Sequence, residues 1–276
     1  MLWKRGRVSN DVEDLRASGG GWRPGGVKLG LGGLLVLGVL SLIFNRDLIS
    51  PFMSVDGGGT VPAVSDPKRD AKEQEAVEFV SFVLDDAQAV WVQQLRGYRN
   101  AKLVLFRDGV RSPCGEAESS AGPFYCPVDE KVYLDLGFFD ELRTRFRAPG
   151  EFAAAYVVAH EIGHHVQNVL GIERRVRALR QQNRASANEL SVKMELQADC
   201  LAGVWAHSTA QRQLLESGDL ESALGAASAV GDDRVQKEAI GRVHPESFTH
   251  GTSAQRVQWF NRGYERGDAG ACETFN

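Results

Sequence analysis

The run AHEIGHHVQ (residues 159–167) constrains the fold more than any other part of the chain, because it holds three of the six histidines. The residues before it, APGEFAAAYVVA, offer Pro149 and Gly150 as helix-start signals and then an apolar run long enough for a helix. Side chains four residues apart lie on one face of a helix. We therefore expect a buried helix that presents His160 and His164 to one point.

These two histidines belong to the pattern HExxH, in which two histidines hold a zinc ion and the glutamate, here Glu161, acts as general base. Zinc accepts nitrogen and oxygen ligands in a tetrahedron and can keep one position for water. The alternative is a polar helix face with ordinary hydrogen-bonded histidines, which leaves unexplained why a helix rich in alanine and valine carries them. The pattern favours one Zn²⁺ per chain.

A catalytic zinc site needs a third protein ligand. A third histidine in the longer pattern HExxHxxGxxH is excluded, because this chain has Gln167 and Leu170 at the two decisive positions. The segment MELQADCLAGVW supplies Glu195 and, four residues later, Asp199, beside small residues that allow close helix packing. We predict that Glu195 binds the metal and that Asp199 accepts a hydrogen bond from the outer nitrogen of a ligand histidine.

Other residues near the motif have rival or lesser roles. Glu173 and Glu189 are alternative third ligands, but neither has an aspartate four positions later. His165 points about 100° away from His164, so we predict a surface or packing role for it rather than metal binding. Gly163 weakens the helix. We expect that another backbone approaches closely at this glycine.

The N-terminal residues set the expected compartment. Residues 1–28 carry six Lys or Arg side chains against three carboxylates, and residues 29–44 contain no charge. A cleaved signal peptide is the alternative, but its apolar stretch is shorter and ends in a small-x-small site, which is missing here. We therefore predict four parts: a cytoplasmic segment at residues 1–26, a transmembrane helix in contact with membrane lipid at 27–44, a flexible linker at 45–75 and an extracytoplasmic domain at 76–276.

The remaining pattern predicts an α+β domain that is mostly helical with a small sheet. Residues 76–95 show apolar side chains at helical spacing, and residues 102–106 and 131–136 are typical of strands. Almost everything after Phe138 has the pattern of helices. The formal net charge of −4 gives no sign of a nucleic-acid partner.

The four cysteines become informative if the domain is exported, because cysteines in an oxidising compartment usually form pairs. Cys114 and Cys126 bracket a loop between the two predicted strands, so we predict a disulfide between them. Cys200 would then pair with Cys272 and tie the C-terminal tail to the core. A free buried thiol at Cys200 is the alternative.

The chain resembles the bacterial family of "putative neutral zinc metallopeptidases" in three stretches: FFDELRTRFRAPGEFAAAYVVAHEIGHHVQNVLGI, ELQADCLAGVWAH and FTHGTSAQRVQWFNRGY. The resemblance extends from about residue 100 to the C-terminus. It implies a membrane-anchored zinc peptidase of the gluzincin type, in which a glutamate is the third zinc ligand. It also implies that His250 is an oxyanion donor and Arg256 an orienting charge. A capped helix start with a solvated histidine and arginine is the alternative.

The expected reaction is hydrolysis of a peptide bond in a peptide or protein substrate. Glu161 would take a proton from a zinc-bound water and pass it to the leaving amine. The strand at residues 133–136 is a candidate edge for an extended peptide, and the alternative is that this strand is simply buried. A non-catalytic, zinc-stabilised binding module of the cell envelope is the alternative, but the general base and the lack of cysteine ligands favour the enzyme. The oligomeric state is not predicted.

Overall fold

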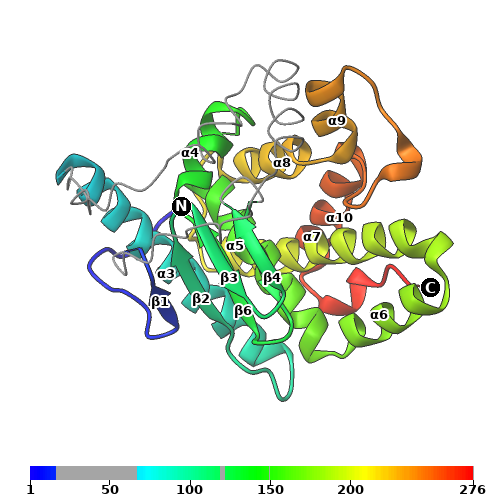
Figure 1. The fold of residues 1–276 in the computed structure, drawn as a ribbon. Helices are drawn as coiled ribbons and strands as arrows, with labels where there is room; N and C mark the ends of the chain where they lie inside the picture. Colours follow the sequence, from blue (N-terminus) through cyan, green and yellow to red (C-terminus); the bar gives the residue numbers. More distant parts are fainter. Residues whose placement is uncertain (17–66, 119–121, 149, 276) are drawn as a thin grey trace. The chain divides into compact units, whose positions relative to one another are not determined.

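A computed structural model describes residues 1–16, 67–118, 122–148 and 150–275 (Figure 1). The predicted transmembrane helix at residues 27–44 and most of the predicted linker lie outside these residues. No helix in the described part of the chain is long and apolar enough to span a bilayer. All described residues except 67–70 belong to one compact unit.

Four strands form the main sheet, in the order β1 (Val12–Asp14), β2 (Lys102–Phe106), β6 (Lys131–Asp135) and β5 (Phe124–Cys126). The first three run parallel, and β5 is antiparallel to β6. Because successive side chains in a strand point to opposite faces, one set joins the helical core: Leu103, Leu105, Val132 and Leu134. The opposite set packs with the hairpin of β3 (Gly109–Ser112) and β4 (Gly115–Glu118): Val104, Phe106 and Tyr133.

The predicted sheet edge at residues 133–136 is wrong. Strand β6 lies between β2 and β5 and is paired along both edges. The outer strands of the described sheet are β1 and β5, and β5, which lies between Cys114 and Cys126 in the sequence, forms the edge next to β6. A strand of three residues is too short to show the alternation by which strands are recognised in a sequence.

The N-terminal residues pack against the domain. Val12 of β1 pairs with Leu103 of β2, and Met1 is buried in the core. Residues 1–16 therefore fold with the domain rather than forming a separate segment. A single membrane crossing between residues 16 and 71 would place β1 and β2 on opposite sides of the membrane. The membrane crossing predicted for residues 27–44 lies outside the described residues and stays a prediction, which can be tested against this pairing.

The described part of the chain is mostly helical, as predicted, and its α-helices are α3 (Pro67–Gln94), α4 (Gly137–Thr144), α5 (Glu151–Val169), α6 (Ile172–Gln182), α7 (Ala187–Gln211), α8 (Asp219–Ala229), α9 (Asp232–Ile240) and α10 (Ser253–Arg266). Short 3₁₀ turns lie at Arg184–Ser186, Pro245–Ser247 and Ala269–Cys272. Helix α5 packs against α7 and α8, and α10 packs against the same two helices. The motif helix is therefore buried among helices, as its apolar composition predicts.

Two glycines set the separation of α7 and α10. A Cβ atom at Gly203 would overlap with the backbone of Phe260, and one at Gly263 would overlap with the backbone of Cys200. The two helices therefore touch backbone to backbone. This contact brings α10 close enough for a side chain from its first turn to reach the middle of α7.

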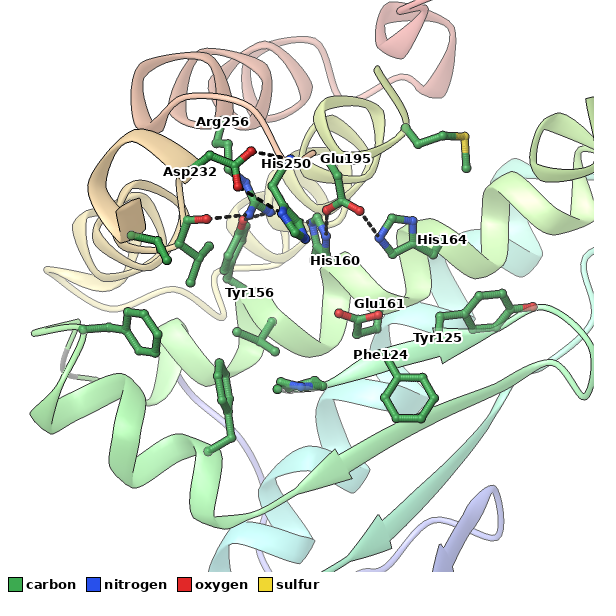
Figure 2. A pocket seen from close by; sticks show the side chains of 18 of the residues that line it. Phe124, Tyr125, Tyr156, His160, Glu161, His164, Glu195, Asp232, His250 and Arg256 are labelled. Carbon is green, nitrogen blue, oxygen red and sulfur yellow. Dashed lines mark hydrogen bonds and ion pairs between the residues drawn. The ribbon is translucent and has the colours of Figure 1, made fainter. Parts of the chain in front are cut away.

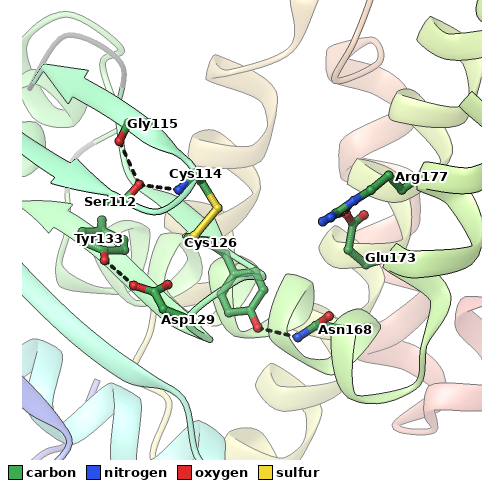
Figure 3. The surroundings of a disulfide bond; sticks show 10 residues. Ser112, Cys114, Gly115, Cys126, Asp129, Tyr133, Asn168, Glu173 and Arg177 are labelled. Atoms are coloured by element: carbon green, nitrogen blue, oxygen red, sulfur yellow. Dashed lines mark hydrogen bonds and ion pairs between the residues drawn. A yellow bond between two sulfur atoms is a disulfide. The ribbon is translucent and has the colours of Figure 1, made fainter. Parts of the chain in front are cut away.

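Both predicted cysteine pairs form disulfides in the structure. Cys114, in the turn of the β3–β4 hairpin, is bonded to Cys126 at the end of β5 (Figure 3). Cys200 of α7 is bonded to Cys272 and holds the C-terminal tail. The alternative of a free thiol at Cys200 does not hold.

Candidate metal centre

Two helices bring together three side chains that can hold a metal ion: His160 and His164 from α5, and Glu195 from α7 (Figure 2). Their ligand atoms all lie within 4.8 Å of one another. The Glu195 carboxylate is 3.2 Å from His160 Nε2 and 3.5 Å from His164 Nε2. Two ligand atoms bound tetrahedrally at zinc distances are about 3.3 Å apart. The donor set therefore fits zinc.

Each of these histidines has a hydrogen-bond partner at its outer nitrogen. His160 Nδ1 lies 2.9 Å from Asp199 Oδ1, and His164 Nδ1 lies 2.9 Å from Gln167 Oε1. A carboxylate only accepts, so His160 Nδ1 carries the proton and Nε2 is left for a metal. Gln167 is oriented in turn, because its Nε2 donates to Met194 O at 2.7 Å. Gln167 was not predicted, although its place three residues after His164, on the same helix face, is a usable signal.

Asp199 is the centre of a buried hydrogen-bond cluster. Besides His160, it accepts hydrogen bonds from Tyr156 Oη at 2.5 Å and from Arg256 Nε and Nη2 at 2.8 and 2.9 Å. Burial raises the pKa of Asp199, but Arg256 and His160 outweigh it and hold this pKa below its usual range. Burial likewise lowers the pKa of His160, yet the carboxylates of Asp199 and Glu195 raise it to about 10. These carboxylates make the His160 ring a stronger base toward a cation.

Gly163 lies where α5 crosses α7. A Cβ atom there would be 2.9 Å from Ala198 O and 3.1 Å from Ala198 Cα. The predicted close approach of another backbone is therefore confirmed. The contact also holds Glu195, one turn before Ala198, at the separation at which its carboxylate meets both histidines.

The Glu161 carboxylate lies beside the three candidate ligands without joining their cluster (Figure 2). It is 7% exposed and lines the cleft at the site. Burial raises the pKa of Glu161, although His164 and His160 partly oppose this shift. A raised pKa makes this carboxylate a stronger proton acceptor, as a general base requires.

His250 reaches the cleft from the loop before α10, and Asp232 holds this loop (Figure 2). The Asp232 carboxylate accepts backbone N–H bonds from Thr249, His250 and Gly251 at 2.7, 2.6 and 3.0 Å. It also lies 3.2 Å from His250 Nδ1, and this hydrogen bond raises the pKa of His250 against the effect of burial. Asp232 was not predicted, because it acts through contacts with a loop far along the chain.

The start of α10 combines a helix cap with a buried arginine. Thr252 caps the helix and forms a capping box with Gln255. Arg256, however, is not solvated, since it is 3% exposed and bonded to Asp199. His250 is half exposed.

The rival third ligands lie outside the metal group. Glu173 pairs with Arg177 at 2.8 Å, and Glu189 pairs with Lys193 at 2.9 Å. His165 also stays outside the group, as predicted, and it is buried rather than on the surface.

The metal group opens into a cleft of about 580 Å³. Apolar side chains from several elements line it: Phe124, Phe138, Phe146, Val157 and Met194. A cleft of this volume is in the range of ligand-binding sites.

Residues 1–275 match the family model described as "Putative neutral zinc metallopeptidase". The chain belongs to this family. It is 46% identical over 290 residues to the "Uncharacterized protein YpfJ" of Escherichia coli (strain K12), which covers all of this chain and 99% of that protein. It is 47% identical over 203 residues to the "Uncharacterized protein Rv2575" of Mycobacterium tuberculosis, which covers 70% of this chain and 68% of that protein. No solved structure matches the chain.

The match to the zinc metallopeptidase family includes the N-terminal residues as well as the motif helix. Strand β1 and the candidate metal ligands therefore belong to one family unit. The names of the two relatives state no activity, so the evidence for catalysis is the geometry of the site.

Proposed function

We propose that this protein is a zinc-dependent metallopeptidase of the gluzincin type, a hydrolase that cleaves peptide bonds. The observation that carries the proposal is the placement of four side chains. His160, His164 and Glu195 converge on one point, and Glu161 borders the same point from outside the cluster. Three protein ligands leave the fourth zinc position for a water. Membership of the family supports the same chemistry.

A zinc ion at this donor set would supply a Lewis acid and a water of lowered pKa. Glu161 accepts a proton from the attacking water and passes it to the leaving amine, because burial raises its pKa above that of an exposed glutamate. His250 donates a hydrogen bond to the carbonyl oxygen as negative charge develops there. Arg256 is a positioning residue, since it holds Asp199, which in turn orients His160.

The substrate is proposed to be an extended peptide bound along β5. This strand pairs only with β6 among the described strands, and its residues Phe124 and Tyr125 line the cleft. Addition of a peptide strand to a free sheet edge supplies main-chain hydrogen bonds.

We further propose an extracytoplasmic location for the domain, with membrane attachment through residues 27–44. The two disulfides support this location, because structural disulfides persist mainly in oxidising compartments. The uncharged run at residues 29–44 supports the attachment.

A zinc-stabilised binding module without catalysis is the second candidate. Structural zinc sites are usually closed by four protein ligands, often cysteines. Here the four cysteines form two disulfides, so none is left to bind zinc. Three candidate ligands converge in the described part of the chain. The buried carboxylate of Glu161 beside the group has no role in a structural site, so the geometry favours the enzyme.

The deciding experiment replaces Glu161 by Gln in the full-length, zinc-loaded protein. Zinc content should stay near one per chain, whereas hydrolysis of a pool of quenched-fluorescence decapeptides should fall about 10²-fold or more, the scale of lost general-base catalysis. Glu141→Gln is the control, because Glu141 lines the same cleft outside the metal group. Unchanged hydrolysis in Glu161→Gln would remove the general base from the proposal, and no hydrolysis by the native protein would favour the binding module.

A further inference from the structure

His165 follows the candidate ligand His164 directly, yet its ring lies on another side of α5 and is 0% exposed. Both of its ring nitrogens are hydrogen-bonded. Nε2 donates to the backbone oxygen of Arg99 at 2.6 Å, and Nδ1 lies 2.9 Å from Tyr125 Oη. His165 therefore joins the motif helix to strand β5 and to the chain segment before β2.

The direction of these hydrogen bonds is determined by their partners. A carbonyl oxygen can only accept, so His165 Nε2 carries the proton and Nδ1 accepts. Tyr125 must then donate its hydroxyl proton to His165, and its oxygen accepts from Asn168 Nδ2 at 3.1 Å. The hydrogen bonds therefore form one chain in which each residue donates to the next, from Asn168 through Tyr125 and His165 to the backbone oxygen of Arg99. Loss of one partner would leave a buried polar atom without its hydrogen bond.

Two tyrosine rings contact the His165 ring. Tyr98 and Tyr125 both meet it edge to face, at centroid distances of 5.3 and 5.4 Å. The buried Tyr98 hydroxyl has no hydrogen-bond partner among the described residues, so Tyr98 contributes packing. Tyr125 contributes packing and a directional hydrogen bond.

Tyr125 is the middle residue of β5, so it faces the opposite side of the sheet from its two neighbours. Phe124 stacks on Tyr133 at 4.9 Å, on the side of the β3–β4 hairpin, and Cys126 is bonded to Cys114. Tyr125 is therefore the residue by which β5 reaches α5. Figure 2 shows Phe124 and Tyr125 across the cleft from the metal group.

We propose that His165 is a positioning residue, which fixes strand β5, and a peptide bound along it, relative to the metal ligands on α5. This inference rests on the proposed peptidase function. His160, Glu161 and His165 belong to one helix, so a strand that is tied to His165 is also held at a set place relative to Glu161. A strand that is already ordered binds a peptide more tightly, because less conformational freedom is lost on binding.

The test compares Tyr125→Phe with Tyr98→Phe in the full-length, zinc-loaded protein. Each change removes one hydroxyl from a ring that contacts His165, but the Tyr98 hydroxyl has no partner in the described part of the chain. We expect the amides of β5 to exchange with deuterium about tenfold faster in Tyr125→Phe, the factor expected for one lost buried hydrogen bond. Tyr98→Phe should exchange as the native protein does. Zinc content should be native in both.

Kinetics on the same decapeptide pool separate positioning from general destabilisation. Tyr125→Phe should raise KM about tenfold and change kcat less, because the lost bond weakens peptide binding rather than proton transfer. Native exchange at β5 and native KM in Tyr125→Phe would overturn the inference. If the native protein cleaves no peptide, the peptidase proposal fails with its peptide-binding consequence, and the exchange result alone then decides whether His165 fixes β5.

Discussion

Arg256 and Asp199 form a buried ion pair with two parallel hydrogen bonds, from Nε to Oδ2 at 2.8 Å and from Nη2 to Oδ1 at 2.9 Å. The two residues lie on α10 and α7, which touch backbone to backbone at Gly203 and Gly263. Because Asp199 also accepts the Nδ1 proton of His160, this ion pair orients a candidate metal ligand.

Arg256→Lys should weaken zinc binding about 10–100-fold, the range for changes in the partners of a ligand histidine. Lysine cannot make the planar, two-bond contact with Asp199, so His160 loses part of its orientation. Competition with a chromophoric chelator measures the affinity. Arg262→Lys, at an exposed position of α10, is the control and should bind zinc as the native protein does. Native affinity in Arg256→Lys would show that the ion pair does not act on the metal site.

Glu195→Ala should abolish stoichiometric zinc binding, because it removes one of three ligands. A bound ion stabilises only the folded chain, so a chelator should lower the Tm of the native protein but leave that of Glu195→Ala unchanged. Metal analysis and thermal melts measure both effects. Glu173→Ala and Glu189→Ala are the controls and should keep zinc. Loss of zinc in Glu173→Ala with retention of zinc in Glu195→Ala would show that Glu173, and not Glu195, is the third ligand.

Asp232→Asn should move the alkaline limb of the kcat/KM profile to lower pH. The hydrogen bond from Asp232 raises the pKa of His250, so the protonated, donating form is present below that raised pKa and is lost as pH rises through it. Without the carboxylate, the loss occurs at a lower pH. Glu238→Gln on α9, whose side chain pairs with Arg234, is the control. An alkaline limb that stays in place in Asp232→Asn would exclude His250 as the titrating group.

Alkylation of the unfolded, unreduced protein should label none of the four cysteines, and prior reduction should expose all four. Mass spectrometry of the labelled peptides measures this. Labelling of Cys200 and Cys272 alone would contradict the C-terminal disulfide and leave the one between Cys114 and Cys126 in place.

A crosslink between positions 11 and 102 tests the placement of the N-terminal residues in whole cells. Asp11 Oδ1 lies 2.6 Å from Lys102 Nζ in the structure, so Asp11→Cys with Lys102→Cys should react with a short bis-maleimide. Each single variant is the control. Crosslinking would show that residues 1–16 and the domain lie on one side of the membrane. Labelling of position 102 from outside the cell, with position 11 protected and no crosslink, would instead support the predicted single-pass topology.

The clustering of His160, His164 and Glu195 could be predicted because it depends on helix periodicity within two short segments. The same holds for Asp199, one turn after Glu195. Each of these relationships spans four residues of one helix, and only the packing of α5 on α7 had to be assumed.

The remaining parts of the site depend on contacts between distant segments. Strand β5 consists of three residues and gives no periodic signal, so the sequence pattern predicts the sheet edge at the longer β6 instead. The Asp232 carboxylate binds the backbone of His250, which lies 18 residues later in the chain, and no helix or strand period relates these two positions. Val12 pairs with Leu103 across a long intervening segment. The charge pattern of the N-terminal residues predicts a different compartment for them, so their pairing with β2 is not expected from the sequence.

The contact at Gly163 makes the spacing of the candidate metal ligands depend on a residue that has no side chain. A methyl group at this position would meet the backbone oxygen of Ala198 and force α5 and α7 slightly apart. Glu195 would then stand farther from the two histidines, beyond the separation that tetrahedral zinc ligands have. The spacing of the candidate ligands is thus set in part by a missing side chain, at a position that contributes no ligand atom.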